Sequence, residues 1–143
     1  MSELVLIEDR GAIRILTLNR PEARNPLDAD MVKALLAALG DARRRTEIAA
    51  LIITGAGKAF CAGADLAALQ VLQSKTPGEN LQDSRLLMKL YRAIRQYPKP
   101  VAAAVNGPAI AGGCGLMTVC DYAVATAEHA KFGYPEVRIG FVA

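Results

Sequence analysis

The chain has 143 residues, of which 52% are hydrophobic and 22% charged, so it is long and apolar enough for one buried core and is not intrinsically disordered. Its formal net charge of +3 is too small to indicate a nucleic-acid-binding protein. A single histidine and three cysteines without paired spacing argue against a metal site and against a disulfide framework.

The first predicted element is a hairpin. Residues 4–7 form a short apolar run, and residues 13–18 alternate between apolar and polar side chains, so both segments are typical of strands. Turn-forming residues at 8–11 separate them. We therefore expect two antiparallel strands near the start of the chain.

An irregular connection and then a helix follow this hairpin. Pro21 and Pro26 interrupt regular structure between the second strand and the helix. Asp28 is a suitable N-cap, because a carboxylate there can accept a hydrogen bond from the first turn. The apolar residues that come next recur at helical spacing, which predicts an amphipathic helix over 29–45.

The rest of the chain alternates between apolar strands and helices. Further strands are predicted at 49–54, 101–105 and 121–125, and further helices at 66–73, 81–96 and 112–119. A polar stretch with proline and glycine predicts a mobile loop over 74–80, and two prolines within 97–100 end the long helix. This order indicates an α/β domain over residues 1–143 with mostly parallel central strands.

Two glycine-bearing segments are the most informative features of the chain. Residues 60–66 and 106–116 each follow a predicted buried strand and each lead into a helix. Turns without bulky side chains expose backbone N–H groups, and ligands of parallel sheets bind beyond the carboxyl ends of the strands. Two such turns facing each other would form a two-donor cradle for an oxyanion. Cys61 and Cys114 lie inside these turns and are expected to be small buried side chains rather than nucleophiles.

Other common motifs fit the sequence poorly. The segment 55–58 ends like a phosphate-binding loop, but Ala59 stands where Ser or Thr belongs and Phe60 breaks the dinucleotide pattern. His129 is expected to be an exposed loop residue, because no Ser or Cys forms a nucleophile elbow. Glu136 is left as the candidate general acid or base, on a backbone that the preceding proline restricts.

Taken together, these segments resemble the enoyl-CoA hydratase/isomerase family, also called the crotonase superfamily. The likeness covers nearly the whole chain, and the order and spacing of its motifs make it specific. The matching segments are Leu18-Asn19-Arg20-Pro21-Glu22-Ala23-Arg24-Asn25, Phe60-Cys61-Ala62-Gly63-Ala64-Asp65-Leu66, Asn106-Gly107, Gly112-Gly113-Cys114, Cys120-Asp121 and Phe132-Gly133-Tyr134-Pro135-Glu136. The resemblance implies a crotonase-like spiral of ββα units, here without the family's C-terminal helices and therefore truncated.

The resemblance also implies a site. The thioester oxygen would accept hydrogen bonds from the backbone N–H groups of Ala64 and Gly112, and Glu136 would act as general acid or base. Coenzyme A would lie along Ala62 and Leu66, with Arg24 near it. Because coenzyme A is part of the acyl-CoA substrate, no separate cofactor and no metal are expected.

One position departs from the family pattern and leaves the reaction open. Hydratases of this family usually carry two glutamates, and the position of the first is Gly115 here. Hydration of a 2-enoyl-CoA is the family's common activity and is expected first, whereas double-bond isomerisation needs only one base and is the alternative. A non-catalytic CoA-binding or RNA-binding homologue is a third possibility, and the basic run 43–45 and the pI of about 8.9 are the only support for RNA.

The sequence and the family resemblance also lead to expectations about the cellular location and the oligomeric state of the protein. No apolar stretch is long enough to span a membrane and no targeting presequence is visible, so we expect a cytoplasmic protein without a membrane partner. The resemblance implies a homo-oligomer, either a trimer or a dimer of trimers, once a C-terminal region is supplied.

Overall fold

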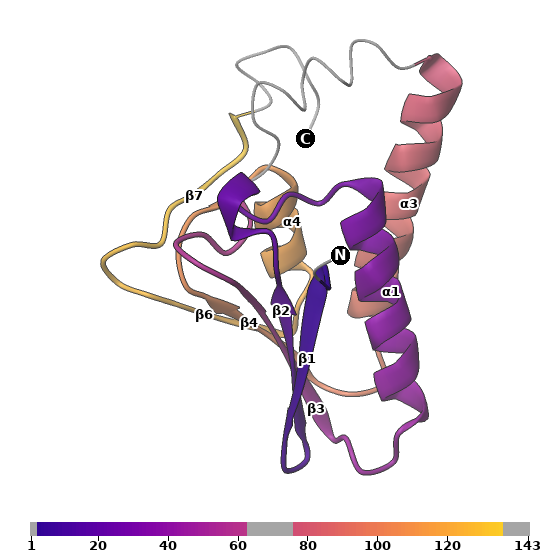
Figure 1. Cartoon of the computed structure of the whole chain (residues 1–143), viewed down its shortest axis with the longest axis vertical. Helices are drawn as coiled ribbons and strands as arrows, with labels where there is room; N and C mark the ends of the chain where they lie inside the picture. Colours follow the sequence, from indigo (N-terminus) through magenta and orange to yellow (C-terminus); the bar gives the residue numbers. More distant parts are fainter. Residues whose placement is uncertain (1–2, 63–75, 136–143) are drawn as a thin grey trace.

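A computed structural model describes residues 3–62 and 76–135 of the chain. Helices α1 and α3 run side by side next to a twisted sheet, and α4 lies closer to one end of that sheet (Figure 1). The strands are β1 (Val5–Arg10), β2 (Ile13–Leu18), β3 (Ala50–Gly55), β4 (Val101–Val105), β5 (Ala109–Ile110), β6 (Tyr122–Ala125) and β7 (Phe132–Gly133). The helices are α1 (Ala29–Arg44), α3 (Pro77–Arg95), α4 (Gly112–Thr118) and a 3-10 turn at Pro21–Ala23.

The main sheet has five strands in the order β1-β2-β3-β4-β6. The hairpin β1–β2 is antiparallel, and the three other pairings are parallel. This confirms the predicted α/β class with mostly parallel central strands. Strands β3 and β4 are neighbours, so the two glycine-bearing segments leave the sheet at the same edge.

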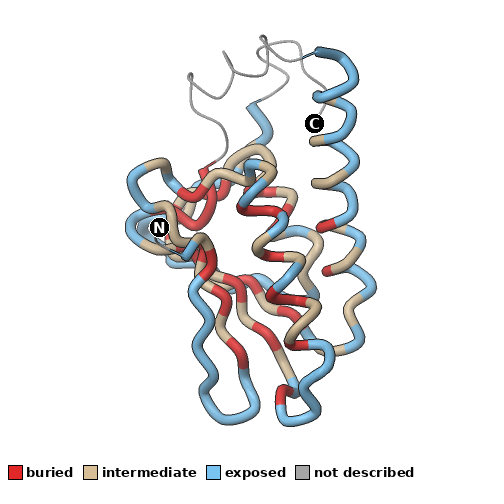
Figure 2. The backbone as a smooth tube through the Cα atoms, turned by 45° about the vertical axis from the view of Figure 1, so that its right-hand side comes forward, coloured by how far each residue is buried: buried red, intermediate tan, exposed pale blue. Residues whose placement is uncertain are grey.

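The core lies between the sheet and the helices. Figure 2 shows the buried positions concentrated on the strands and on the helix faces turned toward them. Asp28 caps α1 as expected, because its side chain accepts a hydrogen bond from the Met31 N–H at 2.9 Å. Leu35 of α1 and Leu90 of α3 are fully buried, and each contributes about 2 kcal/mol through removal of its apolar surface from water.

Two predicted boundaries are wrong. Strand β1 continues through Arg10, so the turn predicted over 8–11 shrinks to the hairpin tip, where Gly11 adopts a left-handed φ of 59°. Helix α3 already begins at Pro77, so the loop predicted over 74–80 is wrong for its described part. Thr76 and Glu79 form a reciprocal capping box there, which supplies partners for the first N–H groups of the helix. The helix predicted over 66–73 lies outside the described residues.

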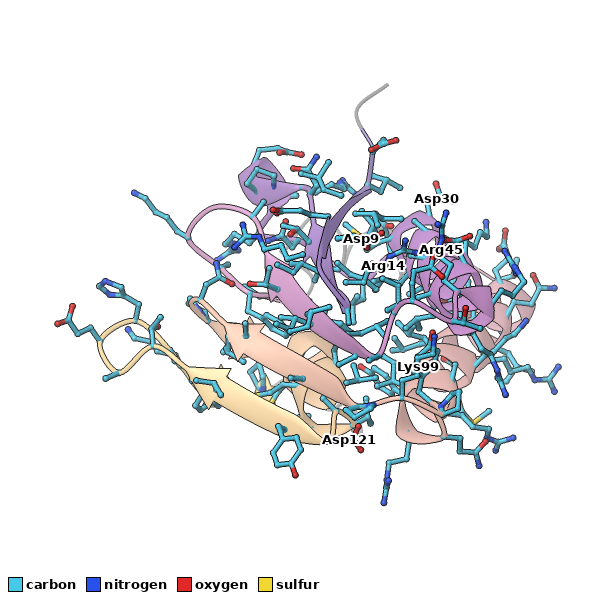
Figure 3. All side chains as sticks on the ribbon, turned by 90° about the horizontal axis from the view of Figure 1, so that it is seen from below. Asp9, Arg14, Asp30, Arg45, Lys99 and Asp121 are labelled. Atoms are coloured by element: carbon cyan, nitrogen blue, oxygen red, sulfur yellow. The ribbon has the colours of Figure 1, made fainter. Side chains whose placement is uncertain are left out.

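A buried arginine joins the hairpin to α1. Arg14 is 2% exposed and points from β2 toward α1, beside the apolar residues of the same strand face. Its Nε and Nη2 donate to the two carboxylate oxygens of Asp9 at 2.7 and 2.8 Å, and its Nη1 donates to Asp41 at 2.6 Å. Figure 3 shows Asp9, Arg14 and Arg45 close together, where the hairpin meets α1. Each of the three guanidinium nitrogens therefore donates to a carboxylate, and this pairing compensates the burial of the charge.

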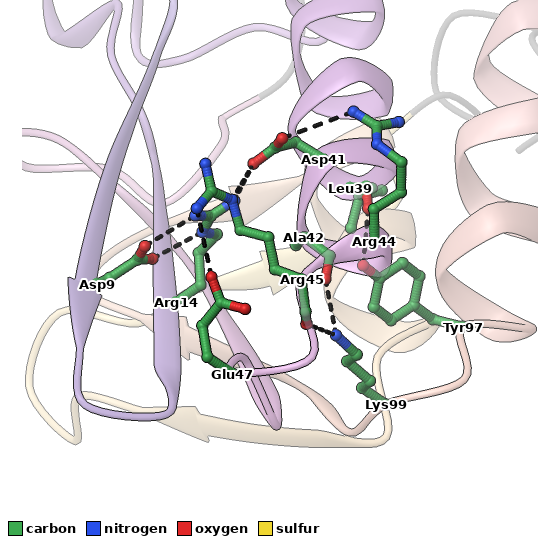
Figure 4. A network of polar contacts seen from close by, with 10 residues as sticks. All are labelled: Asp9, Arg14, Leu39, Asp41, Ala42, Arg44, Arg45, Glu47, Tyr97 and Lys99. Carbon is green, nitrogen blue, oxygen red and sulfur yellow. Dashed lines mark hydrogen bonds and ion pairs between the residues drawn. The ribbon is translucent and has the colours of Figure 1, made fainter.

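The end of α1 is held by the segment that follows α3. Lys99 Nζ donates to the carbonyl oxygens of Ala42 and Arg45 at 2.7 and 2.6 Å, and the Tyr97 hydroxyl donates to Leu39 at 2.7 Å (Figure 4). A cation at a helix C-terminus satisfies orphan carbonyls and complements the helix dipole. The segment 97–100, predicted only to end a helix, thus also caps α1.

Candidate active site

The two glycine-bearing segments lie directly against each other. Cys61 and Ala109 form a parallel bridge, in which the Cys61 N–H donates to the Pro108 carbonyl at 3.2 Å and the Ile110 N–H donates to the Cys61 carbonyl at 2.9 Å. We call this region, residues 55–62 against 106–113, the glycine-turn contact. The prediction that the two turns face each other is confirmed for their described parts.

Glycines make this contact possible. A Cβ added at Gly113 would lie 1.8 Å from the Cys61 carbonyl oxygen, and one added at Gly107 would lie 2.1 Å from the Lys58 carbonyl oxygen. Backbone atoms cannot yield as a flexible side chain can, so neither position accepts a larger residue without movement of the main chain. Glycine at these two positions therefore permits the close approach of the two backbones.

The side chain of Asn106 adds a second link across the same contact. Its Oδ1 accepts from the Gly55 N–H at 3.2 Å, and its Nδ2 donates to the Gly57 carbonyl at 3.0 Å. One amide thus pairs with a donor and an acceptor of the first turn, because its oxygen accepts while its nitrogen donates. The second segment holds the first at both its strand end and its loop.

Asn25 is a structural residue of the site that sequence reasoning missed. Its side chain is completely buried, and its Nδ2 donates to the carbonyl oxygens of Ala56 and Ala59, each at 2.9 Å. Its Oδ1 accepts from the Arg20 N–H at 2.8 Å. The sequence signal was an asparagine within an irregular connection, because asparagine adopts the left-handed region more readily than most residues. The structure gives Asn25 a left-handed φ of 55°.

Two of the residues predicted to bind coenzyme A are brought together. The Ala62 N–H donates to the Arg24 carbonyl at 3.0 Å, so the chain before α1 lies beside the end of the first glycine turn. Arg24 is exposed and adopts a left-handed φ of 61°. Ala64, Leu66 and Glu136 lie outside the described residues.

Gly112, one of the two predicted oxyanion donors, is the first residue of α4. Ala111 before it has a φ of 53° and a ψ of −123°, a strained conformation for a residue with a side chain, and its N–H donates to Gly133 at 2.9 Å. Within the described ranges, no group accepts a hydrogen bond from the Gly112 N–H.

The position that departs from the family pattern is occupied by a neighbour. A Cβ at Gly115 would lie 2.7 Å from the Tyr91 hydroxyl oxygen and 3.0 Å from Cζ of the same ring. The Tyr91 hydroxyl also donates to the Gly112 carbonyl at 2.6 Å. Tyr91 comes from α3 and was not among the predicted site residues, because no local pattern indicates which helix covers the start of α4.

The three cysteines and the single histidine all lie in the described part of the chain. Cys61 and Cys114 are buried as expected, and burial raises the pKa of the Cys120 thiol to about 12, with the neighbouring Asp121 adding to the effect. His129 is exposed, as predicted. Residues 3–62 and 76–135 contain no group of three or more potential metal ligands from His, Cys, Asp and Glu. Among the helices described, none is long and apolar enough to cross a membrane.

Comparisons with a family model and with individual proteins all find similarity to enoyl-CoA hydratases. The family model described as enoyl-CoA hydratase/isomerase matches residues 8–143. The chain is 48% identical over 135 residues to a Thermus thermophilus protein assigned provisionally as an enoyl-CoA hydratase, covering 94% of this chain and 53% of that protein. It is 38% identical over 137 residues to the short-chain-enoyl-CoA hydratase of Clostridium acetobutylicum, covering 95% and 51%.

Solved structures of enoyl-CoA hydratases also match most of this chain and about half of their own length. An enoyl-CoA hydratase from Polaromonas sp. JS666 superposes with a TM-score of 0.90 at 38% identity, covering 96% of this chain and 53% of that one. The neighbour's fold therefore contains the α/β arrangement described above. The chain spans about half the length of the relatives and structures that it matches.

Proposed function

Because this chain belongs to the enoyl-CoA hydratase/isomerase family, we propose that it serves acyl-CoA enolate chemistry, first of all the hydration of a 2-enoyl-CoA thioester. One observation carries this proposal: the glycine-turn contact leaves the Gly112 N–H without an acceptor among the described residues, at the shared edge of two parallel strands. The names of the similar proteins support hydration as the reaction.

In the proposed mechanism, the thioester oxygen accepts hydrogen bonds from the N–H groups of Ala64 and Gly112. Negative charge develops on that oxygen when an enolate forms, and fixed backbone donors stabilise it without reorganisation. Loss of one such donor typically costs about 3 kcal/mol of transition-state stabilisation. Glu136 would move the proton as general acid or base.

Coenzyme A is proposed to bind on the side of the first glycine turn. Ala62 and Leu66 would offer backbone groups to it, and the exposed Arg24 would lie near its phosphates. The hydrogen bond between Ala62 and Arg24 supports this placement, because it brings two of the three candidate residues to one place. Coenzyme A is part of the substrate, so the proposal involves no further cofactor.

A specific observation favours double-bond isomerisation as the second candidate. Water addition by the family's usual route uses two carboxylates, and the first of these positions is Gly115, whose side-chain space holds the ring of Tyr91. One carboxylate is sufficient to carry a proton along an allylic system, so a lone Glu136 suits isomerisation. We also propose a cytoplasmic homo-oligomer, with a trimer or a dimer of trimers as the expected form.

The proposal is tested with crotonyl-CoA and a 3-enoyl-CoA in parallel spectrophotometric assays, with the Clostridium hydratase as positive control. Loss of the conjugated absorbance from crotonyl-CoA would support hydration, and its appearance from the 3-enoyl-CoA would support isomerisation. Glu136→Gln should abolish whichever reaction occurs. Binding of CoA without turnover would instead identify a non-catalytic binder, and salt-sensitive binding of RNA would favour the nucleic-acid alternative.

A further inference from the structure

Tyr91 touches the first turn of α4 through both its hydroxyl and its ring. The hydroxyl donates to the Gly112 carbonyl at 2.6 Å, and the ring and hydroxyl together occupy the space beside Gly115. We propose that Tyr91 is a positioning residue that fixes the Gly112 turn and closes position 115 to a second carboxylate, so that the site carries out isomerisation. This inference rests on the proposed function and, against the order given there, favours isomerisation, the second of its two candidate reactions, over hydration.

The hydroxyl matters because the start of α4 has little stability of its own. The turn reads Gly112-Gly113-Cys114-Gly115, and glycine is among the weakest helix formers because of its backbone entropy. Ala111, the N-cap residue, is strained and makes no side-chain cap. A short hydrogen bond from another helix therefore restrains the Gly112–Gly113 peptide group, which adjoins the Ala111–Gly112 peptide group that carries the Gly112 N–H.

The ring matters because it decides what position 115 can hold. At 2.7 Å from Oη and 3.0 Å from Cζ, even a methyl group at Gly115 would require Tyr91 to move, and a glutamate would require more. Tyr91 itself is held on one side by its bond to Gly112. The Tyr91 ring thus fills the space beside Gly115, and a carboxylate side chain at position 115 would require Tyr91 to move.

The first test compares Tyr91→Phe with the wild-type chain, because this variant keeps the ring and removes only the hydroxyl. We expect kcat for the 3-enoyl-CoA to fall about tenfold or more, with KM changed by no more than about twofold. Amide exchange at residues 112–116 should speed up about tenfold while Tm stays close to that of the wild type. Tyr97→Phe is the matched control, since that hydroxyl also donates to a backbone carbonyl, at Leu39, but away from the site.

The second test is a double-mutant cycle on stability that does not depend on turnover. Gly115→Ala should lower Tm by about 3–6 °C in the wild-type chain and should lose this effect in a Tyr91→Ala background. Gly40→Ala is the control, because a Cβ there meets only the tip of Arg44 at 3.9 Å and a helical alanine is favourable. It should leave Tm unchanged or raised in both backgrounds.

The outcomes separate this inference from the function on which it rests. Isomerisation with the losses above and coupling between positions 91 and 115 would support it. The role of Tyr91 would be overturned if Gly115→Ala lowered Tm equally in the wild-type and Tyr91→Ala backgrounds. It would also be overturned if kcat for Tyr91→Phe equalled kcat for Tyr97→Phe. Hydration of crotonyl-CoA by the wild type would overturn the choice of reaction, and the absence of any turnover would overturn the proposed function, while the cycle would still report on the contact.

Discussion

The Gly113 backbone packs on the Cys61 carbonyl so closely that no side chain fits between them. A Cβ at position 113 would lie 1.8 Å from that oxygen and 2.7 Å from its carbon. The two residues belong to different glycine-bearing segments, which leave neighbouring parallel strands at one edge of the sheet. Their approach therefore fixes the distance between the two turns proposed to hold the thioester oxygen.

Gly113→Ala should consequently be among the most damaging small substitutions in the chain. Separation of the two turns would break the bridge between Cys61 and Ala109, and we expect a loss of about 3 kcal/mol or more in the free energy of unfolding. Urea denaturation followed by circular dichroism measures this loss. Gly40→Ala in α1 is the control and should be neutral or stabilising by about 0.5–1 kcal/mol. Equal effects of the two variants would mean that the turns are not in close contact.

Asn25→Asp tests the buried amide that holds the first turn. The aspartate has nearly the same shape but cannot donate to the Ala56 and Ala59 carbonyl oxygens, so it would place an acceptor against two acceptors. We expect a loss of about 2–4 kcal/mol in the free energy of unfolding at neutral pH, measured by urea denaturation. Asn19→Asp is the control, because its amide donates to an exposed carbonyl at Glu3 and should cost much less. A stable Asn25→Asp variant with normal CoA binding would exclude a positioning role for Asn25.

Gly113 lies in a segment that the sequence pattern identified, whereas the role of buried Asn25 was missed, and this difference shows which features the sequence could predict. Periodicity identified the hairpin, the buried strands and the long helices, because each of these depends on neighbouring residues in the chain. The glycine turns could be recognised because their spacing after apolar strands is itself a pattern. The capping box at Thr76 and Glu79 was also readable, and overlooking it placed the start of α3 too late.

Pairings between distant segments could not be predicted in the same way. Strands β5 and β7 have two residues each, and their ladder exists only because the second glycine turn meets residues 132–133. Arg14 occupies a buried, inward-facing strand position, and its partner Asp41 lies 27 residues away. Tyr91 and Gly115 come from helices whose contact no local pattern indicates. Such features follow from tertiary packing, which overrides local propensity.

The thiols provide a test of how tightly this packing excludes solvent. Cys61 and Cys114 are buried, and desolvation raises the pKa of Cys120 to about 12, so little of the Cys120 thiol is ionised at pH 8. We expect native protein to react with Ellman's reagent at a rate at least about 100-fold below that of a free cysteine, and all three thiols to react after denaturation in urea. Rapid reaction of one thiol in the native protein would show that its segment opens, and Cys→Ser variants would identify which one.

The last prediction concerns acid stability and the carboxylate of Asp41. Hydrogen bonds from Arg14 and then Arg45 lower the pKa of Asp41 to about 2, below its value in the unfolded chain. A lowered pKa in the folded state means that its contribution is fully present above about pH 4 and is lost as the pH falls toward 2. Asp41→Asn should therefore lower Tm at pH 7 by a few degrees, and this difference should vanish near pH 2.

Asp30→Asn is the matched control for this titration. Asp30 lies on the same helix but is exposed and pairs only loosely with Lys33, at 3.2 Å, so its removal should change Tm little and in a salt-sensitive way. Thermal melts of the three proteins from pH 7 to pH 2 decide the matter. A Tm difference between Asp41→Asn and the wild type that stayed constant across this range would mean that Asp41 acts through packing rather than through its charge on Arg14. A Tm difference that disappears between pH 4 and pH 2 would instead show that the ion pair between Arg14 and Asp41 stabilises the contact of the hairpin with α1 and is lost in acid.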